Sequence, residues 1–298
     1  RRAQGVMRAS LSEFEVLYEV PVTASGISSG KMHTVWRRRG CSLDSSAGDN
    51  NEDNEVTVKI VNAQEIPTLK EAEGVLAEVS LLAAVQHHPN ILGYYGFLSS
   101  KGDNDEDFAP KEPLGMSIVV DYCSGGDLLT AVVESPFSEK RANKVIKGIL
   151  SGLVHLHSMD IVHRDIKADN VMLACGDWPV ISDFRVAAHT SDAKEMMRRC
   201  GSPGYVAPEI ILGSQYSAKV DCFSTGVVLF FVLCGQLPFV GNDIMSVMRR
   251  TLRDRVTFDL PRFEHVSVRC KMFIASLVCK TADDRPDATA ALEDCWLA

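Results

Sequence analysis

The stretch "HRDIKADN" at residues 163–170 decides the fold, and "ISDFRVAA" at 181–188 follows it closely. Phosphoryl transfer needs an acid that orients the attacking hydroxyl, oxygen ligands for Mg²⁺, and cations that neutralise the phosphates. Asp165, Asn170 and Asp183 would supply the oxygens. A single Asp or Asn in a loop is more often a turn or capping residue, so the hypothesis depends on the whole set.

The composition is that of an ordinary globular chain, with 298 residues, 46% hydrophobic and 23% charged. This length allows one large domain or two coupled lobes. The net charge of −8 argues against nucleic-acid binding, and the most apolar run, 227–234, is too short for membrane insertion. Nine cysteines without a CxxC pair indicate free thiols, so we expect an intracellular protein, cytosolic or nuclear. Because the chain does not begin with Met, we expect a fragment.

The residue pattern changes along the chain from strands to helices. Alternation and apolar runs predict strands at 14–20, 31–37, 55–62 and 115–123. Helical spacing begins at residue 69, with an apolar stripe formed by Leu69, Ala72, Leu76, Val79 and Leu82. An amphipathic helix around 142–154, N-capped by Ser138, and an apolar helix at 222–234 follow.

Two acidic stretches, 40–55 and 99–113, interrupt the predicted strands. Neither has apolar periodicity, so we expect solvated hairpin insertions. A docking role for these insertions is the alternative.

These motifs, with "GYVAPE" at 204–209 downstream, resemble the eukaryotic protein kinase family over about residues 14–297. The "HRDIK" and "GSPGY" segments are similar to the serine/threonine branch, and "CGSPGYVAPE" is most similar to the calcium/calmodulin-dependent group. The resemblance implies an α+β, two-lobed kinase fold. It divides the chain into an N-terminal extension at 1–13, a small antiparallel β-rich N-lobe with one regulatory helix at about 14–122, a hinge at about 121–126, and a larger, mainly α-helical C-lobe at about 127–297.

The resemblance also implies ATP and Mg²⁺ as cofactors and proteins as substrates. The catalytic residues it implies are Asp165, Lys167, Lys59 and Glu78. Asp165 would orient the substrate hydroxyl, and Lys167 would contact the transferring phosphate. Lys59 would hold the α- and β-phosphates and pair with Glu78, although either charge alone is more often an exposed surface group. Asn170 and Asp183 would bind Mg²⁺.

The nucleotide pocket would be built by residues from both lobes. They are Gly30, Val35, Lys59, Asp121, Cys123, Asp127 and Met172. Asp121 and Cys123 would bond adenine through their backbone, and Asp127 would face the ribose. The glycine loop is the poorest match, because "SSGKMHTV" at 28–35 keeps only Gly30 and side chains at 28 and 33 should hinder close approach to phosphate. We expect weakened ATP affinity.

Other family positions concern substrate docking and structural support. Ser202, Asp127 and Asp169 would dock the substrate, with a preference for basic residues before the target Ser or Thr. The alternative is that Asp127 serves the ribose only and Asp169 is solvated. The structural residues are His163, Arg164, Glu209, Asp221 and Arg285.

Four of the structural positions have expected partners. Glu209 and Arg285 would form a buried ion pair. Asp221 would hold the catalytic-loop backbone, or serve simply as an acid at a helix N-terminus. Arg164, which in the family usually meets a phosphate, would face a permanent acid instead, either Glu195 or Asp192.

Arg185 stands where the family has glycine. An arginine keeps the backbone N–H, while its Cβ disfavours positive φ. We therefore expect that Asp183 still binds Mg²⁺ and that Arg185 lowers mobility without removing a ligand.

Three function classes follow from these residues. An active serine/threonine kinase using MgATP is favoured, because Lys59, Glu78, Asp165, Asn170 and Asp183 are all retained. A catalytically impaired pseudokinase acting as a nucleotide-binding scaffold or allosteric partner is the alternative. A small-molecule phosphotransferase is disfavoured by the peptide-docking segment "GSPGYVAPE". Upstream regulators and calmodulin dependence stay open.

Overall fold

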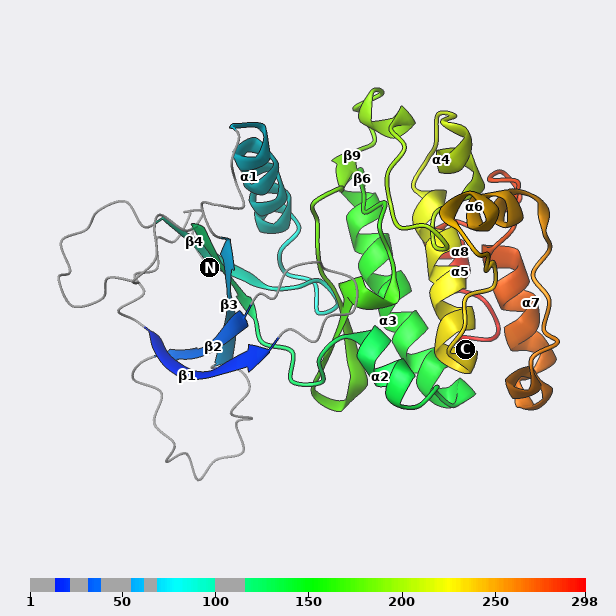
Figure 1. Cartoon of the computed structure of the whole chain (residues 1–298), viewed down its shortest axis with the longest axis horizontal. Helices are drawn as coiled ribbons and strands as arrows, with labels where there is room; N and C mark the ends of the chain where they lie inside the picture. The colour runs from blue at the N-terminus through cyan, green and yellow to red at the C-terminus, as the bar shows by residue number, and fades with distance from the viewer. Residues whose placement is uncertain (1–13, 22–31, 39–54, 62–68, 100–115) are drawn as a thin grey trace. The chain divides into compact units, whose positions relative to one another are not determined.

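The computed structural model describes residues 14–21, 32–38, 55–61, 69–99 and 116–298 (Figure 1). These residues form two units, whose main boundary lies between Ser124 and Gly125, while His87–Ile91 belongs to the second unit. The boundary falls inside the predicted hinge. The N-terminal extension at 1–13 and nearly all of the two acidic insertions lie outside the described residues.

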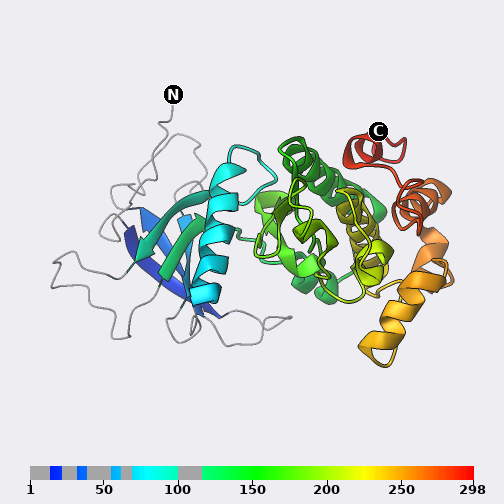
Figure 2. The ribbon, with the colours of Figure 1, turned by 90° about the horizontal axis from the view of Figure 1, so that it is seen from above.

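The N-terminal unit is an antiparallel five-stranded sheet accompanied by one helix. Its strands are β1 (Phe14–Pro21), β2 (Met32–Arg38), β3 (Glu55–Val61), β4 (Tyr94–Ser99) and β5 (Met116–Asp121). They are arranged in the order β1-β2-β3-β5-β4, and the helix α1 (Leu69–Ala84) lies beside β4 (Figure 2). The predicted β-rich unit with one helix is confirmed, although β4 was not predicted.

The apolar stripe predicted on α1 is only partly buried. Leu82 is buried, whereas Leu76 is 48% exposed. The prediction was therefore wrong at Leu76. The helix instead buries Glu78, which is 7% exposed.

The C-terminal unit is mainly helical, as predicted. Its helices are α2 (Leu128–Glu134), α3 (Glu139–Ser158), α4 (Pro208–Leu212), α5 (Lys219–Cys234), α6 (Ile244–Arg253), α7 (Val268–Leu277) and α8 (Ala288–Leu292). Two small sheets accompany them: β6 (Ile161–Val162) pairs with β9 (Ala188–His189), and β7 (Val171–Ala174) pairs with β8 (Trp178–Ile181). The helix α3 packs against α5, α8 and β8.

Two helices form the centre of this unit. The helix α3 begins after Ser138, whose Oγ accepts a bond from the backbone N–H of Arg141 at 3.3 Å, which is the predicted N-cap. The helix α5 is buried on nearly every side and begins at Lys219. Asp221 therefore lies in the first turn of α5, whereas the sequence prediction began the helix at residue 222. No helix in the described ranges is both long enough and apolar enough to cross a bilayer.

The predicted free thiols agree with the described cysteines. The eight described cysteines are thiols outside disulfides, and three of them, at positions 123, 222 and 270, are buried. The ninth, Cys41, lies outside the described residues.

The ion pair between Glu209 and Arg285 ties α4 to the chain before α8. The Arg285 Nη1 and Nη2 atoms donate to the two Glu209 carboxylate oxygens at 2.7 and 3.1 Å. The arginine also donates to the carbonyl oxygens of Cys279 and Lys219. Because Arg285 is almost fully buried, its charge depends on these partners.

We expect Glu209→Gln to lower the free energy of unfolding by about 3–5 kcal/mol, because it leaves a buried guanidinium without its counter-charge. Chemical denaturation of both proteins measures the difference. The matched control is Arg141→Gln, which breaks the half-exposed pair between Arg141 and Asp177 and should cost less than about 1 kcal/mol. Equal losses in the two variants would contradict the assignment of Glu209–Arg285 as a buried structural pair.

Candidate active site

The buried carboxylate of Asp221 fixes the backbone of the catalytic loop. Its Oδ2 and Oδ1 atoms accept the backbone N–H groups of His163 and Arg164 at 2.9 and 2.8 Å. The Nε2 atom of His157 lies 2.9 Å from Oδ2. Burial alone would raise the pKa of Asp221, but the hydrogen bond and charge of His157 and the neighbouring His163 outweigh it and lower the pKa. The carboxylate thus stays ionised and anchors the catalytic loop through its two backbone N–H groups.

His163 joins the catalytic loop to the segment that carries Asp183. Its Nδ1 atom accepts the backbone N–H of Asp165 at 3.3 Å, and its Nε2 atom lies 3.0 Å from the carbonyl oxygen of Ser182. The ring also makes an edge contact with buried Phe184, with 5.1 Å between centroids. His163 thereby positions both functional segments.

Asp165 presents one carboxylate oxygen that the protein does not satisfy. Its Oδ2 atom accepts a bond from the Asn170 amide at 3.1 Å and lies 3.4 Å from Lys167 Nζ. Its Oδ1 atom is buried and has no hydrogen-bond donor among the described residues. A buried carboxylate oxygen without a donor is costly, unless a ligand supplies one. This oxygen is therefore suited to accept a proton from a substrate hydroxyl.

Lys167 links Asp165 to the predicted docking segment. Its Nζ atom donates to the Ser202 hydroxyl at 2.9 Å while it stays close to Asp165. Ser202, predicted to dock the substrate, is thus in contact with Lys167. The lysine cation consequently lies beside the carboxylate on which the reaction would depend.

Asn170 and Asp183, the predicted metal ligands, lie on segments bonded to each other. The backbone N–H and the hydroxyl of Ser182 both donate to the Asn170 carbonyl oxygen, at 2.9 and 3.0 Å. The Asn170 amide nitrogen is committed to Asp165, which leaves the amide oxygen as its ligand atom.

An amide oxygen and a carboxylate are donors that suit Mg²⁺, which usually takes one or two protein ligands and completes its shell with water and phosphate. Within the described part of the chain, no group of three or more His, Cys, Asp or Glu residues could hold a metal. One amide oxygen and one carboxylate therefore form a donor set that fits Mg²⁺.

Arg185 contacts Asp183 directly, and the sequence analysis did not predict this contact. The Arg185 Nε and Nη2 atoms donate to the two Asp183 carboxylate oxygens at 2.7 and 2.5 Å. The positive φ of 64° falls on Asp183, and Arg185 is not among the described residues with a positive φ. That Arg185 lowers mobility without removing a metal ligand stays a prediction.

The buried Arg164 side chain is paired with the chain's own acid. Its Nη2 atom donates to Glu195 Oε2 at 2.7 Å, and its Nη1 atom donates to the Glu195 carbonyl at 2.6 Å. The bond from Arg164 holds the pKa of Glu195 below its ordinary value, and the charge of Arg198 acts in the same direction. Of the two acids suggested by the sequence, Glu195 is the partner. Asp192 instead accepts the backbone N–H groups of Lys194 and Glu195.

Tyr216 is a residue of this network that the sequence did not reveal. Its hydroxyl accepts from Arg164 Nη1 at 3.1 Å and lies 2.8 and 2.9 Å from the carbonyl oxygens of Glu195 and Arg198. Burial raises the pKa of Tyr216 to about 12, so the hydroxyl keeps its proton at neutral pH. A single tyrosine between helices carries no local motif, which explains why it was missed.

The two predicted docking acids differ in their partners. Both carboxylate oxygens of Asp127 accept bonds from Thr130, at 2.7 Å from its backbone N–H and 3.0 Å from its hydroxyl, so Asp127 is the N-cap of α2. Burial raises the pKa of Asp169, and the charges of Asp127 and Asp165 raise it further, against an opposing effect of Lys167. Asp169 thus belongs to a cluster of carboxylates that favours a cation. Met172 pairs with Asp127 in an isolated β-bridge.

The remaining predicted site residues belong to the N-terminal unit. Lys59 lies on β3, paired with Ile118 of β5, and Val35 lies on β2, paired with Thr57 of β3. Their side chains, and all of Gly30, fall outside the described part of the structure. The pairing of Lys59 with buried Glu78 therefore stays a prediction.

The hinge residues lie at the end of the same sheet. Asp121 ends β5, and its backbone N–H donates to the Gly93 carbonyl at 3.0 Å. Its carboxylate accepts from the Gly93 N–H and the Tyr95 hydroxyl, each at 2.7 Å. The Asp121 N–H is thus already used, so it would not be the group that bonds adenine. Cys123 is buried two residues further on.

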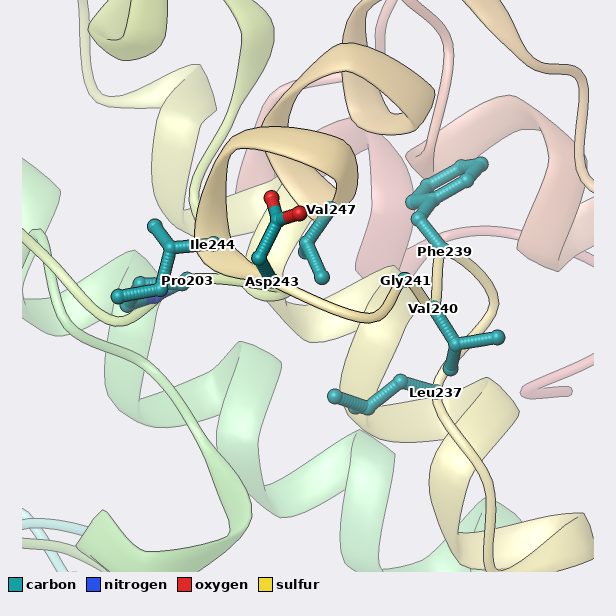
Figure 3. Close-up of a pocket in the computed structure, with 8 residues that line it drawn as sticks. All are labelled: Pro203, Leu237, Phe239, Val240, Gly241, Asp243, Ile244 and Val247. Carbon is teal, nitrogen blue, oxygen red and sulfur yellow. The ribbon is translucent and has the colours of Figure 1, made fainter.

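A separate apolar hollow of about 330 Å³ lies next to the docking segment (Figure 3). It is lined by Pro203, by the loop from Leu237 to Gly241, and by the first turns of α6 at Ile244 and Val247. The one carboxylate in its lining, Asp243, caps α6 through the Ser246 N–H at 2.7 Å. The hollow therefore contains no group for phosphoryl transfer, and it is distinct from the catalytic cluster.

The catalytic cluster and its supporting loops are those of a protein kinase, and the sequence matches the protein kinase domain over residues 45–297. The chain belongs to the protein kinase family. The predicted family and fold class are both confirmed.

Several curated relatives are similar to this chain. "Probable serine/threonine-protein kinase 2" of Plasmodium falciparum is 39% identical over 183 residues, covering 60% of this chain and 36% of that protein. Calcium-dependent protein kinase 4 of Plasmodium berghei is 30% identical over 254 residues, covering 84% of this chain and 46% of that protein. Myosin light chain kinase A of Dictyostelium discoideum is 30% identical over 244 residues, covering 80% and 78%. The chain thus spans less than half the length of the first two.

The pair between Arg164 and Glu195 predicts a pH-dependent contribution to stability. Because the pKa of Glu195 is lowered on folding, its contribution is complete above the unfolded-state value of about 4.3 and is lost as the pH falls through the lower folded-state value. We expect the difference in unfolding free energy between wild type and Glu195→Gln to be constant from about pH 8 to 5 and to shrink as the pH falls below about 4.3. Denaturation at each pH measures it.

The control for net charge is Asp192→Asn. It removes an acid whose bonds in the described structure go to the backbone N–H groups of Lys194 and Glu195 and not to Arg164. It should not reproduce the same profile. A Glu195→Gln difference that persists unchanged at about pH 3 would show that the carboxylate charge is not what holds Arg164.

Proposed function

We propose that this chain transfers the γ-phosphate of MgATP to serine or threonine hydroxyls of proteins. The observation that carries the proposal is the unsatisfied, buried Oδ1 of Asp165, held between Lys167 and Asn170. The relative named as a probable serine/threonine-protein kinase supports the same reaction class.

In the proposed reaction, Asp165 Oδ1 accepts the proton of the substrate hydroxyl. The hydroxyl oxygen forms a bond to the γ-phosphorus, and the bond from that phosphorus to the bridging oxygen breaks to release ADP. Lys167 Nζ, next to Asp165, stabilises the negative charge of the transferring group. Mg²⁺, when bound, supplies further charge neutralisation through Asn170 and Asp183. Lys59 would hold the remaining phosphates.

A second candidate is a catalytically impaired, nucleotide-binding scaffold or allosteric partner. The specific observation in its favour is the bidentate pair between Arg185 and Asp183, since it covers one of the two metal ligands. The retained set of Asp165, Lys167 and Asn170 favours catalysis. Direct measurement of phosphate transfer distinguishes the two.

We expect the purified chain with MgATP to phosphorylate Ser- and Thr-containing peptides of a mixed library, and Asp165→Asn to reduce the rate by about 10²–10⁴-fold, the usual contribution of a positioned general base. Asp177→Asn, which changes an acid paired with the distant Arg141, is the matched control and should keep wild-type activity. Transfer that is equal in wild type and Asp165→Asn would reject the mechanism, and its absence in wild type at every Mg²⁺ concentration would favour the scaffold.

We further propose that substrates carry a basic residue N-terminal to the target hydroxyl, and that Asp169 recognises it. Both carboxylate oxygens of Asp127 already accept hydrogen bonds from Thr130. Asp169 lies near the negative charges of Asp127 and Asp165, and a substrate arginine would offset this repulsion. One relative is named as a calcium-dependent protein kinase, and calcium dependence of this chain stays an open question.

The test uses two peptides that differ only by Arg or Gln at one upstream position. Asp169→Asn should reduce the ratio of their kcat/KM values about tenfold, equivalent to ~1.4 kcal/mol. A loss of catalysis through the neighbouring Asp165 would slow both peptides equally, so it cancels in this ratio. An unchanged ratio, or a peptide library in which acidic residues are preferred upstream, would show that Asp169 does not recognise a basic residue of the substrate.

A further inference from the structure

The pair between Arg185 and Asp183 is a two-point contact between a guanidinium and a carboxylate. The Nε and Nη2 atoms of Arg185 each bond a different oxygen, at 2.7 and 2.5 Å, and the Arg185 backbone N–H lies 3.3 Å from Oδ1. Such bidentate pairs have a fixed planar geometry and are among the stronger ionic contacts. Both oxygens through which Asp183 could ligate a cation therefore face a guanidinium.

The local backbone creates this contact. Asp183 has a φ of 64°, a left-handed conformation that Asp tolerates better than most residues, and it allows the carboxylate to bond the chain two residues ahead. Phe184 is buried beside His163, which fixes the residue between the two partners. The contact is thus set by the same turn that places Asp183.

The two partners differ in exposure. The Asp183 side chain is 13% exposed and that of Arg185 is 50% exposed. Solvent therefore reaches the guanidinium but hardly the carboxylate. The guanidinium is thus accessible to solvent, whereas the carboxylate lies on the turn at Asp183 and is largely shielded.

A guanidinium and a divalent cation compete for the same carboxylate, because the bidentate pair already uses one lone pair of each oxygen. Mg²⁺ needs oxygen ligands at about 2.0–2.1 Å in nearly octahedral geometry, and a guanidinium so close would add cation–cation repulsion. Binding of the metal at Asp183 is therefore weaker while Arg185 keeps this contact.

We propose that Arg185 is a built-in competitor of the metal at Asp183, which raises the divalent-cation concentration that this site needs. The inference depends on the proposed role of Asp183 as a metal ligand. It assigns Arg185 a regulatory position in the site, and it makes occupancy of Asp183 dependent on the divalent-cation supply. The opposing view is that the pair is a partly exposed ion pair of negligible strength.

The test measures metal binding and does not need activity. Mn²⁺ alone is titrated into the intact chain, and the free ion is followed by electron paramagnetic resonance. Arg185→Gln should bind Mn²⁺ at Asp183 at least about tenfold more tightly than wild type, because the competing cation is gone. Asp183→Asn in the Arg185→Gln background should abolish the gain, which identifies the site. Arg185→Lys keeps the positive charge but cannot form the bidentate contact. Its Mn²⁺ affinity should lie between those of wild type and Arg185→Gln.

The matched control is Arg199→Gln, which removes the same charge from an exposed arginine whose Nη2 donates to the Leu212 carbonyl. It should leave Mn²⁺ affinity within about twofold of wild type, given the screening of exposed charges. Equal affinity in wild type and Arg185→Gln, including undetectable binding in both, would overturn the inference. An equal gain in Arg199→Gln would also overturn it. Failure of the proposed function is separate, because it would appear as absent phosphate transfer whatever the Mn²⁺ affinities are.

Discussion

The structure depends on two backbone N–H groups, at His163 and Arg164, that have to be satisfied inside the protein. The buried carboxylate of Asp221 accepts both, and each such donor left unsatisfied would cost about 1–3 kcal/mol. Arg164 has a φ of 67°, an uncommon conformation for an arginine that persists only where its surroundings hold it. Asp165 follows directly in the chain. The position of the reactive carboxylate is therefore determined by an acid in the first turn of α5.

Around this anchor, the chain uses its own charges where a kinase usually meets external ones. Arg164 faces the Glu195 carboxylate, where the family commonly has a phosphate, and Arg185 faces Asp183, which we propose as a metal ligand. The first contact stabilises the segment that carries Glu195, whereas the second engages the carboxylate of the proposed ligand. An internal counter-charge thus stabilises the site at Arg164, whereas at Asp183 it competes with the proposed metal.

The sequence predicted those features that depend on local pattern or on motif order. The α3 helix with its Ser138 cap, the apolar α5 and the partnership of Glu209 with Arg285 all followed from spacing or resemblance. Side-chain geometry could not be predicted in the same way. The contact of Arg185 depends on the positive φ of Asp183, and the role of Tyr216 depends on tertiary packing, so neither leaves a local signal. Helical spacing likewise placed Leu76 in an apolar stripe, but α1 exposes this residue.

The central claim is that internal charges order the catalytic loop and the segment after Asp183 before any phosphate or metal is bound. Amide hydrogen exchange of the metal-free chain, shown by intact mass to be unphosphorylated, tests it most directly. The account predicts that amides of residues 162–171 and 183–200 exchange at least about 100-fold more slowly than in an unfolded peptide, as expected of a locally ordered segment. Exchange of either segment at unfolded-peptide rates, with protection appearing only after phosphorylation or addition of Mg²⁺, would contradict it.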